Sequence, residues 1–323
     1  MQWVDKYRPN RIDDIIGQDN IKELLNMSIQ NGNMPNLLFH GAPGTGKTST
    51  ASSIVMQLYG PHKIDDNVLE LNASDENGIG VIRDKIIRYA GFSVGSPDVN
   101  YANPTFKTII LDEADTMTSE AQTALKKVME LTCNITRFII ICNYDAKIIN
   151  AIKSRCADFK FVQISNDIMI QKLKYIAERE KMQVPDDIYS HITRICKGDA
   201  RRSINTLQNL KYLPVITEQN LYNITSFIDD KYIDQYWEYI VSSEISHLKP
   251  IVQDIINSGF PIINILNCIK DKIIISEISD KKKADIIIYL GKIERMIIKG
   301  SDTYIQVFAV LTYINTMYRN IKN

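Results

Sequence analysis

One segment constrains this chain more than any other, and it reads Gly41-Ala42-Pro43-Gly44-Thr45-Gly46-Lys47-Thr48. An apolar run at residues 37–39 precedes it, and a helix-compatible segment that starts at Ser49 follows it. This order of strand, glycine-rich loop and helix is the context in which a phosphate-binding loop works, because glycines let backbone N–H groups curl around a phosphate. The pattern predicts a nucleoside triphosphate site lined by the loop and Ser49. Lys47 would contact the β- and γ-phosphates, and Thr48 would hold Mg²⁺.

Composition limits the partners and the type of site. Lys+Arg and Asp+Glu both total 38, so any surface that faces nucleic acid must be a local basic stripe. The five cysteines include no C-x-x-C pair, which argues against zinc and against a disulfide framework. No apolar run approaches about 18 residues and no secretory signal precedes Trp3, so we expect a soluble protein without a membrane partner.

The first half of the chain alternates apolar runs with helical patterns. The runs predict strands of a parallel sheet at residues 37–40, 68–71, 108–111, 138–142 and 159–164. Helices are predicted between them at residues 49–59, 79–90, 119–131 and 147–153. In such a βαβ series the ligand lies at the carboxyl ends of the strands, which is where the glycine-rich loop is found.

Helical patterns dominate the rest of the chain. Residues 167–181, 186–197 and 200–213 predict a compact three-helix unit. Later segments at 237–241, 262–269, 284–299 and 304–318 are apolar around much of their circumference, so they need each other or another subunit as partners. The charged run at 280–283 is predicted to be a solvated loop. We therefore predict an α/β domain at residues 1–164, a three-helix domain at 165–226 and an all-α domain at 227–323.

A second chemical signal follows the apolar run at 108–111, where the chain continues as Asp112-Glu113-Ala114-Asp115. Asp112 is placed to hold the Mg²⁺ that Thr48 shares, through water. Glu113 is placed to polarise a water for in-line attack on the γ-phosphate, because water needs a proton acceptor before it attacks well. Asp115 is a candidate cap for the helix that follows. The alternative for all three is a solvated acidic turn after a strand.

With these motifs in view, the chain resembles the small subunits of replication factor C, which are AAA+ clamp loaders. The glycine loop and the acidic strand end carry the resemblance together with Leu71-Asn72-Ala73-Ser74-Asp75, Trp3-Val4-Asp5-Lys6-Tyr7-Arg8-Pro9 and Ser154-Arg155-Cys156. It is strong as far as about residue 213 and looser beyond. Among the small subunits the chain is most similar to the eukaryotic fourth-subunit type. The resemblance implies an AAA+ P-loop domain, a helical lid and a C-terminal collar that assembles the subunits.

The resemblance also implies roles for residues around the triphosphate. Asn143 matches sensor 1, which orients the attacking water or the γ-phosphate, although an asparagine at a strand end is also a common turn residue. Arg201 matches sensor 2, and Arg202 beside it is the weaker candidate. The segment that wraps the adenine is matched by Tyr7, Arg8, Ile16 and Gly17.

Arg155 matches the arginine finger of the family. An arginine suits that role because its fixed charge and planar fork stabilise negative charge on a transferring phosphoryl group. In the family the finger enters the site of the neighbouring subunit. The alternative for Arg155 is a structural salt bridge within its own chain.

The resemblance further implies contacts with the backbone of duplex DNA, which position a protein without reading sequence. Arg83, Lys85 and Arg88 on the helix predicted at 79–90 are the candidates, and Arg83 matches a phosphate-contacting arginine of the family. Asn77 stands where the family usually has a second arginine. The loop at residues 91–104 is a candidate contact of the sliding clamp.

The interpretation is an ATPase subunit of a hetero-pentameric clamp loader with ATP and Mg²⁺ as cofactors. It would load a PCNA-like sliding clamp onto primer-template DNA, in the nucleus if the source is cellular or at the viral replication site if it is a large DNA virus. Two alternatives remain open: an ATP-binding structural subunit with negligible turnover of its own, and another AAA+ DNA-remodelling ATPase.

Overall fold

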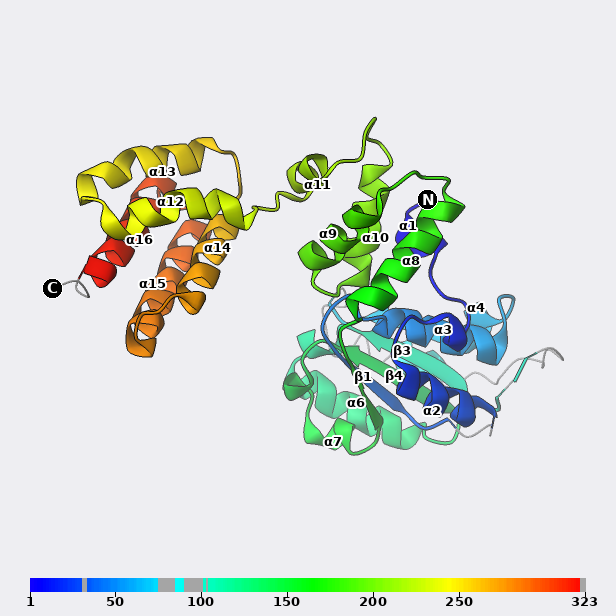
Figure 1. The fold of residues 1–323 in the computed structure, drawn as a ribbon. Helices are drawn as coiled ribbons and strands as arrows, with labels where there is room; N and C mark the ends of the chain where they lie inside the picture. Colours follow the sequence, from blue (N-terminus) through cyan, green and yellow to red (C-terminus); the bar gives the residue numbers. More distant parts are fainter. Residues whose placement is uncertain (31–33, 75–84, 90–100, 103, 320–323) are drawn as a thin grey trace. The chain divides into compact units, whose positions relative to one another are not determined.

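The computed structural model describes residues 1–30, 34–74, 85–89, 101–102 and 104–319. They form two compact units, Met1–Ile216 and Thr217–Asn323 (Figure 1). The first unit contains the sheet and the three helices predicted for the second domain, and the second unit is helical. The division into three domains with boundaries at 164/165 and 226/227 stays a prediction.

A five-stranded parallel sheet is the centre of the first unit, with strand order β2-β3-β4-β1-β5. The strands are β1 (Leu37–Gly41), β2 (Val68–Asn72), β3 (Lys107–Asp112), β4 (Thr136–Cys142) and β5 (Ala157–Phe161). All five predicted strands are present. The fifth begins two residues earlier than predicted and ends at Phe161, because residues 157–161 pair with β1.

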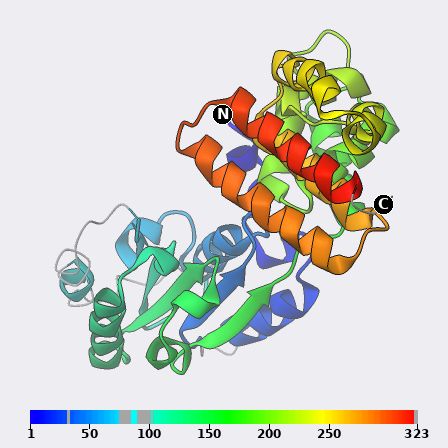
Figure 2. The same ribbon diagram turned by 90° about the vertical axis from the view of Figure 1, so that its left-hand side faces the viewer.

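The three central strands, β1, β3 and β4, are buried on both faces, which explains why they read as continuous apolar runs. The edge strands β2 and β5 keep exposed residues, such as Glu70 and Lys160. Side chains alternate along a strand, so Leu37 and Phe39 of β1 pack on one face and Leu38 packs on the other. The first face is covered by α2 (Asp19–Gln30) and α3 (Lys47–Tyr59), and the second by α6 (Ser119–Leu131) and α7 (Asn150–Lys153) (Figures 1 and 2). The packing leaves the carboxyl ends of the strands free to form a site.

The remaining helices of the first unit are short or belong to the predicted lid. They are α1 (Trp3–Lys6), α4 (Ile64–Asn67), α8 (Asn166–Arg179), α9 (Asp186–Cys196) and α10 (Ala200–Leu210), with 3₁₀ turns at Ile12–Asp14, Ala114–Thr116 and Asp145–Lys147. The helix predicted at 147–153 is therefore shorter than expected, because a 3₁₀ turn occupies its start. Of the helix predicted at 79–90, residues 85–89 are helical and most of the rest lies outside the described ranges.

The suggested cap at Asp115 is wrong. Thr118 caps α6, since its hydroxyl accepts a hydrogen bond from the Ala121 N–H over 3.2 Å. Asp115 lies in the preceding 3₁₀ turn and instead accepts from the Asn143 N–H over 3.4 Å. This acid therefore ties the end of β3 to the end of β4.

The second unit is an all-α bundle around an isoleucine-rich core. Its helices are α11 (Glu218–Thr225), α12 (Asp230–Ser242), α13 (Leu248–Asn257), α14 (Ile262–Ile275), α15 (Asp280–Ile298) and α16 (Thr303–Arg319). Buried Asn315 on α16 donates to the backbone oxygens of Ile240 and Ser243 over 2.8 and 2.9 Å, which closes the end of α12. Across the ranges that the structure describes, no helix combines the length and apolarity that a membrane span requires.

The charged run at 280–283 is not a loop, as the sequence suggested, but the first turn of α15. Asp280 lies in that turn, where an acid interacts favourably with the helix dipole. Lys282 on the same turn donates to the Met317 carbonyl over 3.3 Å. Lysine is also a good helix former, so the polarity of the run does not distinguish a solvated loop from the exposed start of a helix.

Candidate nucleotide site

A pocket of about 1060 Å³, including its solvent-filled mouth, lies at the carboxyl ends of β1, β3 and β4. Most of the predicted site residues line it: Tyr7, Arg8, Ile16, Pro43, Gly44, Gly46, Lys47, Thr48, Ser49, Asp112, Glu113, Asn143 and Arg201. Gly17, Gly41, Ala42 and Thr45 do not line it. The structure thus brings together residues from both ends of the first unit, and their roles remain predictions.

The glycine-rich loop needs its glycines for two different reasons. Gly44 and Gly46 have φ values of 71° and 99°, in the left-handed region that favours glycine. At Gly44 an added Cβ would also lie 1.9 Å from the Asp199 carboxylate, so the loop passes very close to the start of α10. Because α3 begins at Lys47, the N-terminus of that helix faces the pocket. The loop and helix together form a typical anion-binding site.

Lys47 reaches back over the loop that precedes it. Its ammonium donates to the carbonyls of Gly41 and Ala42, both over 2.8 Å, and to the Asn143 side-chain oxygen over 2.9 Å. The residue is only 7% exposed, and this burial lowers the pKa of its ammonium, although Asp112 opposes the effect. A bound phosphate would supply the negative charge that neutral carbonyls lack.

The acidic strand end meets the helix that follows the loop. Asp112 accepts from the Thr48 hydroxyl over 2.8 Å through one carboxylate oxygen and from the Glu113 N–H over 2.8 Å through the other. Glu113 is exposed to the pocket and has a φ of 54°, an uncommon backbone conformation for a residue other than glycine. Strained residues of this kind concentrate at functional sites.

The Thr48–Asp112 pair suits Mg²⁺ and not a structural metal. Within the described parts of the chain, no group of three or more His, Cys, Asp or Glu side chains could hold a metal ion. Mg²⁺ needs no such cage, because it takes one or two protein oxygens and completes its shell with waters and substrate phosphates. A hydroxyl and a carboxylate already in contact at the mouth of an anion site match this requirement.

The two candidate sensors enter the pocket from different elements. Asn143 follows the end of β4, and its contact with Lys47 places its amide beside the loop. Arg201 lies in the first turn of α10 and lines the pocket. Arg202 is not among the lining residues, and its backbone N–H donates to the carboxylate of Asp199, which caps the helix. This geometry favours Arg201 over Arg202.

The far end of the pocket is built by the N-terminal segment. Tyr7 and Arg8 follow α1 and lie with Ile16 in the pocket wall. Arg8 forms an ion pair with Asp5 over 3.5 Å, yet its Nε atom is buried and has no hydrogen-bond partner among the described residues. Buried polar groups are almost always paired, so this donor lacks an acceptor that a ligand could supply.

Sequence reasoning missed eight lining residues: Val4, Pro9, Asp14, Ile15, Ile164, Lys172, Ala200 and Ile204. Ile204 could have been found, because it lies three residues after Arg201 on the same helix face. Lys172 had no signal in the sequence. It projects from α8, and burial lowers the pKa of its ammonium.

Arg155 lies outside the pocket of its own chain. It follows α7, and its guanidinium donates to the Ala151 carbonyl over 2.7 Å and to the Glu130 carboxylate over 2.5 Å. The pair is partly solvent-exposed, with 35% and 43% of the two side chains accessible. An ion pair within the chain therefore exists, and whether Arg155 also acts on a neighbour stays a prediction.

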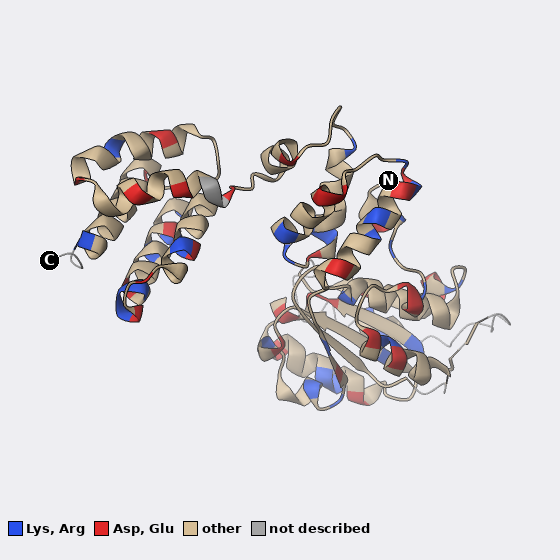
Figure 3. Ribbon diagram, viewed as in Figure 1, with Lys and Arg blue, Asp and Glu red and all other residues tan. Residues whose placement is uncertain are grey.

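Of the predicted DNA-contacting residues, Lys85 and Arg88 are exposed on the helical segment 85–89. Arg83, Asn77 and nearly all of the loop at 91–104 lie outside the described residues. Basic and acidic residues are interspersed along the helices of both units (Figure 3). This distribution agrees with the zero net charge. Any contact with DNA would therefore involve a local basic surface.

Comparison with known proteins identifies the family. Residues 37–164 match the ATPase family associated with various cellular activities (AAA), and residues 228–313 match the replication factor C C-terminal domain. Replication factor C subunit 4 of Homo sapiens is 37% identical over 312 residues, which cover 95% of this chain and 86% of that protein. The replication factor C small subunit of Aeropyrum pernix is 36% identical over 325 residues, with coverages of 100% and 98%.

Solved structures agree on the fold. A variant of Thermotoga maritima RuvB is 14% identical with a TM-score of 0.54, covering 71% of this chain and 79% of that chain. At this identity the likeness concerns the fold alone; together with the AAA match at residues 37–164, it confirms the predicted AAA+ α/β class with helical domains after it. The identity to replication factor C proteins extends over nearly the whole chain and confirms the resemblance seen in the motifs. The chain belongs to the replication factor C small-subunit family of AAA ATPases.

Proposed function

We propose that this chain is an ATPase subunit of a replication factor C-type clamp loader that uses ATP to load a PCNA-like sliding clamp onto primer-template DNA during replication. Family membership over 95% of the chain supports the proposal and favours it over another AAA+ DNA-remodelling ATPase. One observation carries the proposal: in a single pocket, Lys47 donates a hydrogen bond to Asn143 and Thr48 donates one to Asp112. These are the residue types that phosphoryl transfer to water requires.

The pocket divides into a base end and a phosphate end. Tyr7, Arg8 and Ile16 enclose the adenine, and the buried Nε of Arg8 is a donor that none of the described residues uses. Lys47 exchanges its contacts with the Gly41 and Ala42 carbonyls for the β- and γ-phosphate oxygens.

Hydrolysis depends on groups at the strand ends. Thr48 and Asp112 would hold Mg²⁺, which when bound neutralises charge on the β- and γ-phosphates. Glu113 accepts a proton from the attacking water, while Asn143 orients that water or the γ-phosphate. Arg201 stabilises charge on the γ-phosphate from the lid side.

The site is completed only in the assembled complex. Arg155 does not line its own pocket, and we assign it to the site of a neighbouring subunit in a hetero-pentamer. The isolated chain would then bind ATP and hydrolyse it slowly, which accounts for the alternative of a structural subunit with negligible turnover. The compartment would be the nucleus in a cell, or the replication site of a large DNA virus.

Purification of the complex through a tag on this chain tests the proposal. We expect a ring-shaped clamp and related ATPases to co-elute, as identified by mass spectrometry. We further expect ATP-dependent retention of the clamp on primed circular DNA, and loss of that retention in a complex that carries Lys47→Met. Methionine keeps the approximate length of the buried side chain but removes its three donors. ATP-driven translocation on DNA without any clamp would contradict the proposal.

Exposed cations on the segment 85–89 are proposed to contact the DNA backbone without reading sequence. Arg88→Ala should weaken primer-template binding by the complex and reduce the slope of log K against log salt by about 1, because one phosphate contact is lost. Lys85→Ala should behave in the same way. Lys292→Ala removes an exposed cation from α15 in the second unit and serves as the matched control. A slope unchanged by Arg88→Ala would remove this residue from the DNA contact.

A further inference from the structure

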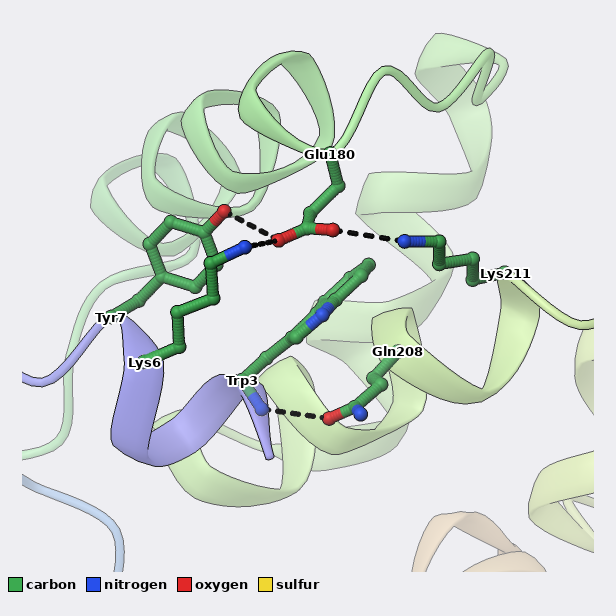
Figure 4. A network of polar contacts seen from close by, with 6 residues as sticks. All are labelled: Trp3, Lys6, Tyr7, Glu180, Gln208 and Lys211. Atoms are coloured by element: carbon green, nitrogen blue, oxygen red, sulfur yellow. Dashed lines mark hydrogen bonds and ion pairs between the residues drawn. The ribbon is translucent and has the colours of Figure 1, made fainter. Parts of the chain in front are cut away.

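The N-terminal helix is attached to the lid through one carboxylate. Glu180, at the end of α8, accepts from the Lys6 ammonium and, over 2.7 Å, from the Tyr7 hydroxyl through one oxygen. Its other oxygen accepts from the Lys211 ammonium over 2.9 Å, just after α10. Figure 4 shows Lys6 and Tyr7 converging on Glu180 from one side and Lys211 from the other. Three separate parts of the first unit therefore meet at this side chain.

Glu180 is held in its ionised form at this position. The Glu180 side chain is only 8% exposed, and its three partners are the ammonium groups of Lys6 and Lys211 and the hydroxyl of Tyr7. A carboxylate removed from water is costly unless it is paired, so these three donors are needed where they lie. Hydrogen bonds from Lys6, Lys211 and Tyr7 lower the pKa of Glu180 to about 2.

Trp3 reinforces the same attachment. Its backbone N–H donates to the Gln208 side-chain oxygen over 2.8 Å, and the residue as a whole is only 4% exposed. The Lys211 ammonium lies 5.4 Å from the centre of the indole ring, and the Tyr7 ring meets the indole edge to face at 6.5 Å. In Figure 4 the indole lies between α1 and Lys211. The helix α1 is thus docked by a buried aromatic anchor and a paired carboxylate.

This docking site is connected to both ends of the nucleotide pocket. Tyr7 lines the pocket beside Arg8, at the base end. The helix α10 carries Gln208 near its end, while at its start the Ala200 N–H donates to the Gly44 carbonyl of the phosphate loop over 3.0 Å. Arg201 lies in that same first turn. The lid element that α1 docks against therefore also touches the phosphate end.

We infer that Glu180 is a positioning residue for the nucleotide, because it holds Tyr7 and α1 against the lid and so couples the docking of α1 to nucleotide binding. The inference rests on the proposed function. It adds a contact outside the pocket that strengthens nucleotide binding. Coupling of this kind is reciprocal, so a docked α1 strengthens nucleotide binding by the same factor by which nucleotide strengthens docking. Both directions can be measured.

The first direction is nucleotide affinity, measured with a fluorescent ATP analogue on the isolated chain. Glu180→Ala should raise Kd about tenfold, within the usual range of coupling between sites. Tyr7→Phe keeps the ring in the pocket wall and removes only the hydroxyl donor, so it should raise Kd less. The double variant should be no weaker than Glu180→Ala alone. Lys174→Ala breaks an exposed ion pair with Asp186 on the next helix and should leave Kd unchanged.

The second direction is the docking of α1, reported by the fluorescence of Trp3. The chain has two tryptophans, so Trp237→Phe leaves Trp3 as the single reporter. In that background Glu180→Ala should increase acrylamide quenching of Trp3, and saturating ATP analogue should reduce it again. In the assembled complex Glu180→Ala should raise the KM for ATP while kcat changes little, because it affects binding and not the reacting atoms.

A failure of the coupling and a failure of the proposed function give different results. If Glu180→Ala exposes Trp3 but leaves Kd unchanged, then docking is merely structural and the coupling does not exist. If the unaltered chain does not bind the analogue, the proposed function fails before Glu180 is tested. Should Glu180→Ala fail to fold, Tyr7→Phe alone still tests the link between the carboxylate and the pocket.

The pH dependence of stability provides a further check on the same carboxylate. The pKa of Glu180 is lowered from 4.5 to about 2 in the folded chain by Lys6, Lys211 and Tyr7. Its stabilising effect is therefore fully present above pH 4.5 and is lost as the pH falls from about 4.5 towards 2. The difference in melting temperature between the wild type and Glu180→Gln should accordingly be largest near neutrality and shrink below pH 4.5. A difference that stays constant across this range would contradict the paired state of Glu180.

Discussion

Replacing Glu113 with glutamine should lower ATP hydrolysis at this chain's own site in the assembled complex about 10²–10⁴-fold, the range for loss of a positioned proton acceptor. The exchange preserves the shape and length of the side chain and removes only its ability to take a proton. The Glu113 side chain is exposed to the pocket, and its backbone N–H donates to the Asp112 carboxylate. Because that backbone contact is kept, the glutamine side chain should occupy the same place. Single-turnover hydrolysis with the enzyme in excess measures this step directly.

ATP binding provides the internal control for this experiment. The contacts of Lys47 and Thr48 do not involve the Glu113 side chain, so the Kd for ATP should stay within about twofold of the wild type. Glu120→Gln removes an exposed acid from the first turn of α6 and should leave turnover unchanged. Normal turnover in the Glu113→Gln complex would mean that another group activates the water.

The sheet and the grouping of the loop residues with Asp112, Glu113 and Asn143 in one pocket could be predicted from the sequence, because each depends on local pattern. The central strands are buried on both faces, so apolar runs such as Phe138–Ile141 identify them without knowledge of their neighbours. The candidate side chains stand at the strand ends, as Asp112 does after Leu111 and Asn143 does after Cys142. Parallel topology then brings those ends together.

Features that depend on distant partners could not be predicted. Lys6 and Glu180 are 174 residues apart, and neither is unusual in its own segment. Asp115 was interpreted as a helix cap, but its partner is the Asn143 N–H, 28 residues away on the next strand end. In each case tertiary packing, and not local pattern, determines what the residue does.

Arg155→Ala should reduce ATP hydrolysis at the neighbouring subunit's site by about 10³-fold or more, because an arginine finger contributes about 10³–10⁵ to kcat. The alternative is that Arg155 serves only its ion pair with Glu130. That pair is partly exposed, and exposed pairs contribute about 0–1 kcal/mol to stability. The two roles of Arg155 therefore differ by several orders of magnitude in their expected effect on turnover.

The location of the defect decides between the two roles. In a complex whose copy of this chain carries Lys47→Met, the remaining turnover belongs to other subunits, and Arg155→Ala in that same chain should lower it further. Arg155→Lys should rescue little, since lysine keeps the charge but lacks the planar fork that matches a phosphoryl group. Glu130→Ala is the matched control: it removes the ion pair and leaves the guanidinium free to reach a neighbour, so turnover should be retained. If Arg155→Ala instead changes only ATP binding by the isolated chain, the assignment of Arg155 to a neighbouring site is wrong.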